Sequence, residues 1–449
     1  MAAFLRRSTA AAAAHLVSRH LRVLTREASS GLRVPSRARL GDPSDVPSIL
    51  PILSQLSAGS LRGTPRWVPT PAPLSTQLEQ RKRSASWLEI TYPFSSDAEL
   101  RDLYMLADGQ SLRAGMFLEE LDAFSADCSM RHADGYNADR PLTVVTAAHD
   151  GLSIFGDGSH SPLSARHDLR LRGAVVSVGS SSMEVQTDLL RVYWRGDEEV
   201  EELLGSCFTV MVARDGLTFG KAAVHQLRGG DPQSDAAARA AAARKTARRE
   251  LAANALALKP PSPTEVPLLH ELWRAARNVD EGPIVDGDVV HAAATHLPMA
   301  ISEQRNLDIM QPAQRNMNGF MFGGYLMRKA LEVAWLSAYR FTRTPPTFAG
   351  LDDVVFRKPV EVGKLVEYVG RVVYTAEDGS LRVFVEAHKL SLRTGQRDPT
   401  NEFHFVFRTR QDEHTSGGSA LIVQPETYEE GMLYLEGRRR WLASTAAGP

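Results

Sequence analysis

The sequence predicts an α+β protein that carries one fold twice. From about residue 88 the chain shows the same pattern in two halves: a helix opened by a glycine-containing turn, followed by several long strands of alternating polarity. One helix followed by antiparallel strands is typical of a layered fold in which the helix lies on the concave face of a curved sheet. Two such halves in one chain can pair their sheets as two subunits of a dimer would.

The N-terminal segment, residues 1–40, has the composition of an organelle transit peptide. It contains eight arginines and a single acid, Glu27, among many Ala and Ser residues. A helix over Ala14–Thr25 would place apolar side chains near one face and arginines near another, which is the form that import receptors read. A mitochondrial destination, in the matrix, is favoured over a plastid. The remaining alternative is a disordered basic arm.

Residues 41–87 contain seven prolines between Pro43 and Pro73, which predicts a disordered, extended linker that cannot bury a core. The first folded unit then spans residues 88–230. Its helix begins at about Gly115, and apolar residues recur along it at helical spacing, at Phe117, Leu121, Phe124 and Cys128. Strands are predicted at Leu142–Ile154, Leu169–Val178, Ser182–Trp194 and Cys207–Arg214.

Residues 231–290 separate the halves. They begin with an Ala/Arg-rich run of high helix propensity that stops at Pro260. A nucleic-acid-binding arm is one interpretation of this run, and a solvated connecting helix is the favoured one.

The second unit spans residues 291–415 and is followed by a C-terminal extension, residues 416–449. Its helix opens at Gly323 and Gly324, with an apolar stripe that runs from Met327 to Phe341. Strands are predicted at Pro346–Phe356, Leu365–Thr375, Leu381–Leu392 and Asn401–Thr409.

Composition excludes several classes of protein. The 449 residues are 43% hydrophobic and 23% charged, which is ordinary for globular domains, and the net charge of −1 gives no general attraction to nucleic acid. The two cysteines, Cys128 and Cys207, lie in no spacing that suits zinc or a disulfide framework, so no metal and no cofactor are expected. No stretch reaches the roughly 18 apolar residues of a membrane span, so no integral membrane segment is expected.

Two motifs identify a family. NMNGFMFGGYLMRKALEVAW at Asn316–Trp335 and LDDVVFRKPVEVG at Leu351–Gly363 resemble the hotdog-fold acyl-CoA thioesterases, and the match is closer still to the mitochondrial acyl-coenzyme A thioesterase 9 type, which carries two hotdogs in one chain. The resemblance covers about Trp87–Trp441. It implies tandem hotdog folds and hydrolysis of fatty acyl-CoA to free fatty acid and CoA.

The resemblance also implies two site residues at fixed offsets. Thioesterases of this family place a catalytic Asp seven residues after the second glycine and an Asn seven residues before the first. The first half has Asp122 but Ala107 in place of Asn, whereas the second half has Asn316 but Leu331 in place of Asp. Since hotdog pairs build each site from both folds, the chain should hold one competent site, Asp122 with Asn316, and Glu332 is out of phase.

The expected chemistry divides among few residues. Asp122 either activates water or attacks the carbonyl directly, and Asn316 orients the water or the carbonyl. Backbone N–H groups of Gly323 and Gly324 at the helix start are candidate donors to the thioester oxygen, although glycines there also serve close packing. Arg357 and Lys358 either bind the phosphates of CoA or are exposed charges at a strand end that keep the sheet soluble.

Several polar residues are left out of the site. Asp150 and Asp352, placed at the start of the strand after each helix, are interpreted as residues that cap or brace a turn, and His388 and His404 as ordinary histidines on a sheet face.

Two alternatives to the thioesterase stay open. One is an acyl-thioester dehydratase of the same fold, which would need a His ahead of the second helix, where residues 300–322 contain none. The other is a non-catalytic acyl-CoA-binding module. Paired hotdogs commonly pack further, so a homo-oligomer is expected, with a trimer of chains as the first guess.

Overall fold

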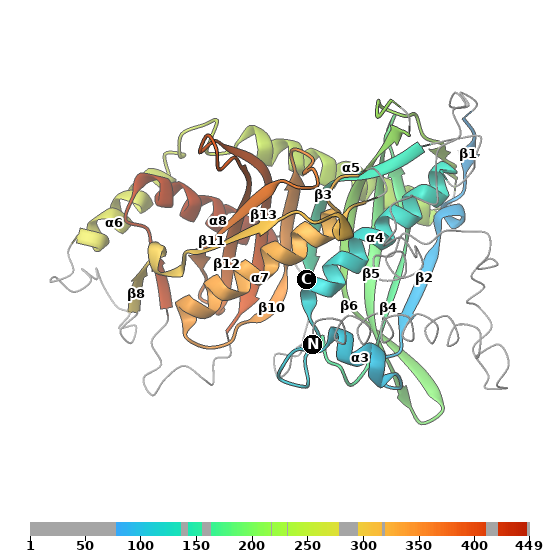
Figure 1. Ribbon diagram of the computed structural model, residues 1–449, viewed down its shortest axis with the longest axis horizontal. Helices are drawn as coiled ribbons and strands as arrows, with labels where there is room; N and C mark the ends of the chain where they lie inside the picture. Colours follow the sequence, from blue (N-terminus) through green and yellow to red (C-terminus); the bar gives the residue numbers. More distant parts are fainter. Residues whose placement is uncertain are drawn as a thin grey trace, which may run out of the picture.

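The computed structural model describes residues 78–135, 142–154, 163–216, 218–230, 232–277, 295–316, 319–409 and 421–446. The expected transit peptide and nearly all of the expected linker lie outside these residues. Inside them, one antiparallel sheet of ten strands runs through both halves of the chain, in the order β2-β4-β5-β6-β3-β10-β13-β12-β11-β9 (Figure 1). The first five strands belong to the first half and the last five to the second.

The strands of the first half are β2 (Leu88–Tyr92), β3 (Leu142–Ser153), β4 (Asp168–Val178), β5 (Ser182–Arg195) and β6 (Glu198–Asp215). Those of the second half are β9 (Gln304–Ile309), β10 (Thr347–Phe356), β11 (Leu365–Thr375), β12 (Ser380–Leu390) and β13 (Arg397–Arg408). The halves meet where β3 pairs with β10, with Leu152 opposite Leu351 and His149 opposite Val354. The expected pairing of two sheets is therefore a continuous hydrogen-bonded ladder.

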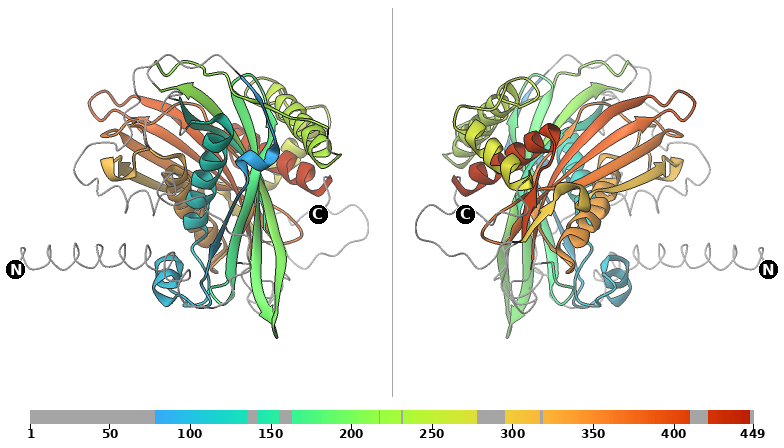
Figure 2. Two further views of the ribbon diagram at one scale, coloured as in Figure 1. Left: turned by 90° about the vertical axis from the view of Figure 1, so that its right-hand side faces the viewer. Right: turned by 90° about the vertical axis from the view of Figure 1, so that its left-hand side faces the viewer.

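One long helix from each half lies on the same face of this sheet. They are α4 (Ala114–Ala133) and α7 (Gly323–Thr342), each 20 residues long, and they pack against each other as well as against the strands (Figure 2). Because α4 has the sheet on one side and α7 beside it, nearly all of its residues are buried, not only the apolar stripe that the sequence shows. Because the two helices have the same length, their residues correspond one to one, beginning with Ala114 of α4 and Gly323 of α7.

The opposite face of the sheet carries α5 (Pro232–Ala253) and α8 (Tyr428–Ala446) (Figure 2). Each sends an arginine to the joint between the halves: Arg248 of α5 pairs with Asp150, and Arg440 of α8 lies 2.6 Å from Asp353. Asp150 and Asp353 are register partners on β3 and β10, and like charges placed opposite one another are unfavourable. The two arginines offset that repulsion and tie both outer helices to the joint.

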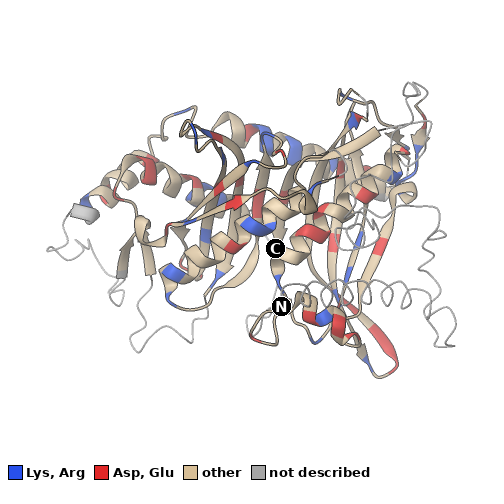
Figure 3. Cartoon of the chain, in the orientation of Figure 1, with Lys and Arg blue, Asp and Glu red and all other residues tan. Residues whose placement is uncertain are grey.

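One expectation about the connecting segments is wrong. Residues 80–87 are not linker, because β1 (Gln80–Arg81) pairs with β7 (Gln226–Leu227) and the short helix η1 (Arg83–Ser86) buries Ser86. The Ala/Arg-rich run forms α5, most of whose described side chains are exposed, and its Arg244 and Arg248 pair with Glu184 and Asp150. Basic residues recur along α5 in Figure 3, and these two are used within the chain.

The interpretation of Asp150 and Asp352 also needs revision. Asp150 lies near the end of β3 and Asp352 in the middle of β10, so the two do not open their strands. Asp352 pairs with Arg382 of β12, and both aspartates brace the outer face of the sheet, not turns.

The C-terminal extension belongs to the second unit. Strand β14 (Leu421–Gln424) pairs with β8 (Thr295–Pro298), and α8 packs on β11 and β12. A shorter helix, α6 (Glu265–Arg277), is held to α8 by Glu265, which contacts Arg439 at 2.7 Å. The remaining described elements are α3 (Ala98–Tyr104), the helix η2 (Met299–Ser302), which packs on α7 and β11, and the helix η3 (Pro312–Gln314).

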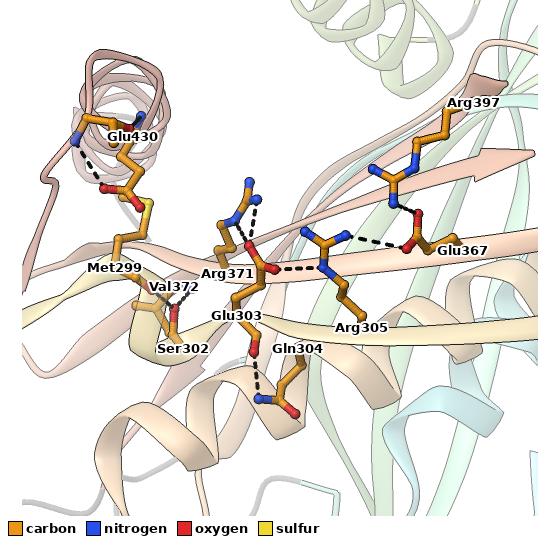
Figure 4. Close-up of polar contacts among 11 residues, drawn as sticks. Met299, Ser302, Glu303, Gln304, Arg305, Glu367, Arg371, Val372, Arg397 and Glu430 are labelled. Atoms are coloured by element: carbon orange, nitrogen blue, oxygen red, sulfur yellow. Dashed lines mark hydrogen bonds and ion pairs between the residues drawn. The ribbon is translucent and has the colours of Figure 1, made fainter. Parts of the chain in front are cut away.

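At the far edge of the sheet an ionic chain joins β9 to β11. Glu303 contacts Arg371 and Arg305, each at 2.7 Å, and Arg305 continues to Glu367, which also pairs with Arg397 (Figure 4). The short strand β9 is thus held by side chains as well as by its backbone ladder. No helix among the described residues is long and apolar enough to cross a bilayer.

Candidate active site

The carboxylate of Asp122 lies at the interface of the two halves and accepts three hydrogen bonds. Oδ2 accepts the backbone N–H of Gly324 at 2.6 Å, and Oδ1 contacts the hydroxyl of Thr146 at 2.6 Å and Nε2 of His149 at 3.1 Å. Gly324 is in the first turn of α7, whose N-terminus carries partial positive charge that favours an anion. An acid with 1% exposure, costly by itself, is thereby paired and hydrogen-bonded.

Thr146 and His149 reach the same oxygen because β3 is irregular. In a regular strand, residues three apart point to opposite faces. The register of β3 against β6 shifts between Thr146 and Ala148, which is the signature of a β-bulge, so both side chains face α4. The bulge therefore builds this part of the site.

Behind His149 a buried polar chain continues into the first half. Its Nδ1 lies 3.0 Å from the hydroxyl of Thr209 on β6, which accepts a hydrogen bond from Ser125 of α4 at 2.9 Å. Sγ of Cys207 lies 3.9 Å from the same nitrogen. Burial by itself lowers the pKa of His149, but the hydrogen bond that its ring donates to Asp122 and the contact with Cys207 outweigh burial and raise that pKa to about 9.

The mirror-related position in the second half is apolar throughout. The helix correspondence places Leu331 opposite Asp122 and Ala334 opposite Ser125. The Ser86 and Ser302 hydroxyls contact the N–H of Val175 and Val372, which makes these two strand positions equivalent. Followed from there, the strand ladders match the first shift in β10, after Phe348, with that in β3 after Thr146, and assign Phe348, Leu351 and Phe405 as counterparts of Thr146, His149 and Thr209. All five counterparts are buried hydrophobic residues. One location therefore concentrates the polar groups, and the other is ordinary core.

The two glycines differ in what they do. The N–H of Gly324 is already bound to Asp122, so the expectation that it faces the thioester oxygen does not match the structure. A Cβ on Gly324 would lie 2.7 Å from Cα of Glu119, and one on Gly323 would lie 2.9 Å from Oδ2 of Asp122. Gly323 is thus the residue that lets α7 begin directly against the carboxylate.

Asn316 lies in the loop that leads into α7. Its backbone N–H donates to the carbonyl of Phe320 at 2.6 Å, and its side-chain oxygen accepts the N–H of Phe320 at 3.1 Å. The structure therefore holds Asn316 in a tight turn ahead of Gly323. Among the described residues the hydrogen-bond partners of Asp122 are Gly324, Thr146 and His149, so the structure does not join Asn316 to Asp122 directly.

Arg357 and Lys358 follow Phe356, the residue that borders the carboxylate. The Phe356 ring is 6.2 Å from the His149 ring and would lie 3.2 Å from a Cβ on Gly323. Both Gly323 and Phe356 are partly exposed, whereas Arg357 and Lys358 are exposed at the surface. Arg357 pairs with Glu402 at 2.6 Å. Arg357 and Lys358 are one and two residues beyond Phe356, so an extended backbone places them at most about 7 Å from it along the chain.

Named relatives can be aligned with most of this chain. Acyl-coenzyme A thioesterase 9, mitochondrial, is 32% identical over 370 residues in Mus musculus, which is 81% of this chain and 79% of that protein. The Homo sapiens protein of the same name is 32% identical over 378 residues, or 83% of this chain and 80% of that protein. The chain belongs to the acyl-coenzyme A thioesterase 9 family.

Membership in the acyl-coenzyme A thioesterase 9 family confirms the expected thioester hydrolase. The two halves, each with one long helix on five antiparallel strands, confirm the expected tandem hotdog folds. A Humulus lupulus relative, acyl-coenzyme A thioesterase 2, chloroplastic, is 30% identical over 375 residues, 82% of this chain and 83% of that protein. The curated relatives are thus named for mitochondria and, in this case, for chloroplasts.

Solved structures are more distant matches, and they cover between about a third and about three quarters of this chain. An acyl-CoA hydrolase from Staphylococcus aureus, in complex with butyryl coenzyme A, coenzyme A and coenzyme A disulfide, covers 34% of this chain and 92% of that one, at 24% identity and a TM-score of 0.32. An acyl-ACP thioesterase from Bacteroides thetaiotaomicron covers 73% of this chain and 100% of that one, at 9% identity and a TM-score of 0.41. No protein-family model matches the sequence.

Sequence reasoning missed Thr146 and His149, which contact Asp122 in this member of the acyl-coenzyme A thioesterase 9 family. Alternation along the strand gives no signal for them, because the bulge that brings them together is not visible in the pattern. His404, which was set aside, stacks on Phe384 at 4.7 Å, and burial lowers its pKa well below the usual value. No group of three His, Cys, Asp or Glu side chains in the described part of the chain is arranged to hold a metal ion.

Proposed function

We propose that the protein hydrolyses fatty acyl-CoA to free fatty acid and CoA at one composite site between its halves. The observation that carries this proposal is the contact between Asp122 of the first half and the Gly324 N–H of the second, at 2.6 Å. A buried carboxylate at the start of a helix from the other half is a base held in fixed orientation beside backbone donors. The apolar counterpart site supports a single site per chain.

The proposed reaction uses Oδ2 of Asp122 as the base. Oδ1 has two protein donors and Oδ2 has one, and Oδ2 is the oxygen beside Gly323. Oδ2 takes a proton from water as the water oxygen bonds to the thioester carbon and the carbonyl electrons move onto oxygen. The intermediate then collapses, the carbon–sulfur bond breaks with its electron pair leaving on sulfur, and Asp122 returns the proton to the thiolate.

Donors for the developing oxyanion come from the same region. The N–H of Gly323 donates to no described residue, so it replaces Gly324 as the proposed backbone donor. Asn316, fixed in the preceding turn, is proposed to orient the carbonyl or the water with its side-chain amide. Direct attack by Asp122 on the carbonyl is the alternative route, and no cofactor or metal is needed for either.

CoA is proposed to lie along the end of β10. Phe356 borders the carboxylate, and Arg357 and Lys358 follow it toward the surface, so the two cations stand where the phosphates of a thioester held at Asp122 would emerge. The acyl chain then enters on the apolar side of α4 and α7.

The test is a substrate panel with purified full-length chain. Straight-chain acyl-CoA thioesters should release free CoA thiol in the presence of a chelator, and Asp122→Asn should lose that activity. Hydration of an enoyl-CoA without thiol release would favour the dehydratase, and binding of acyl-CoA without either reaction would favour the non-catalytic module. Either result would overturn the proposal.

The compartment is proposed to be the mitochondrial matrix. The arginine bias of residues 1–40 supports it, and the relatives named for mitochondria agree. A fusion of roughly the first 60 residues to a fluorescent protein should enter the matrix. Retention in the cytosol, or entry into plastids in a plant cell, would contradict this destination.

The assembly is proposed to be a homo-oligomer, with a trimer of chains as the first guess. Exposed apolar side chains on strand β9 and on α7 support further packing; they are Leu307, Ile309, Leu336 and Tyr339. Light scattering of the full chain should return a multiple of the 49.2 kDa chain mass, and a value of one chain mass would exclude an oligomer.

A further inference from the structure

The buried polar chain described above holds two ionisable side chains besides Asp122: the imidazole of His149 and the thiol of Cys207. The groups that face it come from three elements: Asp122 from α4, Cys207 and Thr209 from β6, and the Phe356 ring from β10. Its exposure is 1%, the same as that of Asp122. Within the described residues, Asp122 is therefore the anion that His149 contacts.

The hydrogen bonds fix how the ring is used. Nε2 meets a carboxylate oxygen, which only accepts, so Nε2 carries a proton in either charge state of the ring. Nδ1 meets Thr209, whose hydroxyl can donate or accept, so the ring keeps its orientation whether it is neutral or cationic. Thr209 is itself fixed by Ser125. The network therefore holds a donor on Oδ1 across a wide range of pH.

The fold itself does not require a histidine here. Leu351 occupies the corresponding place on β10, is buried, and pairs in register with Phe405 as His149 pairs with Thr209. The same sheet position is thus filled by an apolar residue in the half that has no base. Burying a polar group costs free energy of desolvation unless hydrogen bonds compensate, and here the hydrogen-bond partner is the proposed base, Asp122.

We propose that His149 is a positioning residue that holds the Asp122 carboxylate ionised and fixes Oδ1, so that Oδ2 alone faces the water and the thioester. This inference rests on the proposed function of Asp122. The pKa of about 9 for His149 agrees with it, because the ring then remains a cation beside the carboxylate at neutral pH. His149 touches neither substrate nor water in this arrangement and acts through Asp122.

Two variants separate positioning from packing. His149→Leu copies the residue of the mirror position and removes both the donor and the charge, whereas His149→Gln keeps a donor of similar reach without the charge. Both should move the acid limb of the pH profile of kcat upward by about 1 pH unit or more, because the buried carboxylate loses a nearby cation. At the pH optimum His149→Leu should lose up to about 10²-fold in kcat, with His149→Gln less affected and KM nearly constant in both.

A matched control is His404→Gln, which removes another buried histidine that faces the opposite side of the sheet. It should leave the acid limb where the wild-type protein has it. A merely structural role for His149 would lower the melting temperature and leave the pH profile unmoved in both His149 variants, which would overturn the inference. If the wild-type protein releases no thiol, the proposed function fails. If Asp122→Asn is inactive while both His149 variants keep the acid limb of the wild-type protein, only this inference fails.

Discussion

Glu119 and Arg328 hold the same position, the sixth, in their respective helices, and they form an ion pair with each other at 3.0 Å. The surrounding contacts are reciprocal, because Gly115 of α4 packs on Arg328 and Gly324 of α7 packs on Glu119. The pair therefore lies on the pseudo-two-fold axis that relates the halves. In a dimer of identical subunits this position would face its own copy with the same charge. Fusion of two halves in one chain allows the opposite charges.

The first prediction concerns the stability of this joint. Arg328→Glu should lower the free energy of unfolding by about 1–3 kcal/mol, because it sets two acids against each other where Glu119 is 5% exposed. Glu119→Arg should cost a similar amount, and the exchanged double variant Glu119→Arg with Arg328→Glu should recover much of the loss. Urea denaturation of the four proteins measures the coupling. Simple addition of the two losses would show that the ion pair contributes nothing to holding the halves together.

A second prediction concerns Glu120, which accepts hydrogen bonds from Tyr104 at 2.7 Å and Tyr92 at 3.0 Å. Burial raises its pKa to about 7, although the two hydroxyl donors act in the opposite direction. The proton bound by the folded state stabilises it fully below the ordinary pKa, and that contribution is lost as pH rises toward 7.

Glu120→Gln imitates the protonated acid and stays neutral. We expect the variant to match the wild-type protein near pH 5 and to be more stable by about 1–3 kcal/mol near pH 8. Thermal denaturation at both values measures this. A variant that is less stable than the wild-type protein at the higher pH would show that the ionised carboxylate is well accommodated.

A third prediction tests the site for CoA. Arg357→Ala combined with Lys358→Ala should raise KM for acyl-CoA about tenfold and weaken its dependence on salt, because two cations near the phosphates are lost. Turnover of the matching N-acetylcysteamine thioester, which has no phosphates, should not change.

Arg195→Ala, at the exposed end of β5, is the control for a general loss of surface charge. Equal effects of the double variant on both substrates would mean that Arg357 and Lys358 brace the strand end, as the pairing of Arg357 with Glu402 also allows.

The sequence predicted the long elements of the fold because their patterns extend over many residues. The helix openings at Gly115 and Gly323 and eight long strands follow from periodicity, and the ends of most agree with the structure within a few residues. Strand β6 is longer than predicted, since its first half is rich in glutamate and does not alternate in polarity. The short edge strands β2 and β9 were missed, since five or six residues give too little pattern.

The site could be predicted only where it depends on offsets along a helix. The resemblance to the family implies an acid seven residues after the second glycine position, and that offset, nearly two helical turns, leads to Asp122. Thr146 and His149 reach Asp122 through a bulge, and Arg248 and Arg440 reach the joint from distant helices. Contacts of this kind depend on the tertiary arrangement, which local periodicity does not contain.

The account's central claim is that one composite site operates, built on Asp122, while the mirror position is core. Asp122→Asn and Asn316→Ala should each be severely impaired, with losses that do not add, because both act on one thioester. The most direct measurement is kcat for acyl-CoA in Asp122→Asn beside Glu332→Gln, which changes the half-exposed acid next to Leu331. We expect a loss of roughly 10² to 10⁴ in the first and a change within a few-fold in the second. A comparable loss in Glu332→Gln would show that the second half carries its own site and would contradict the claim.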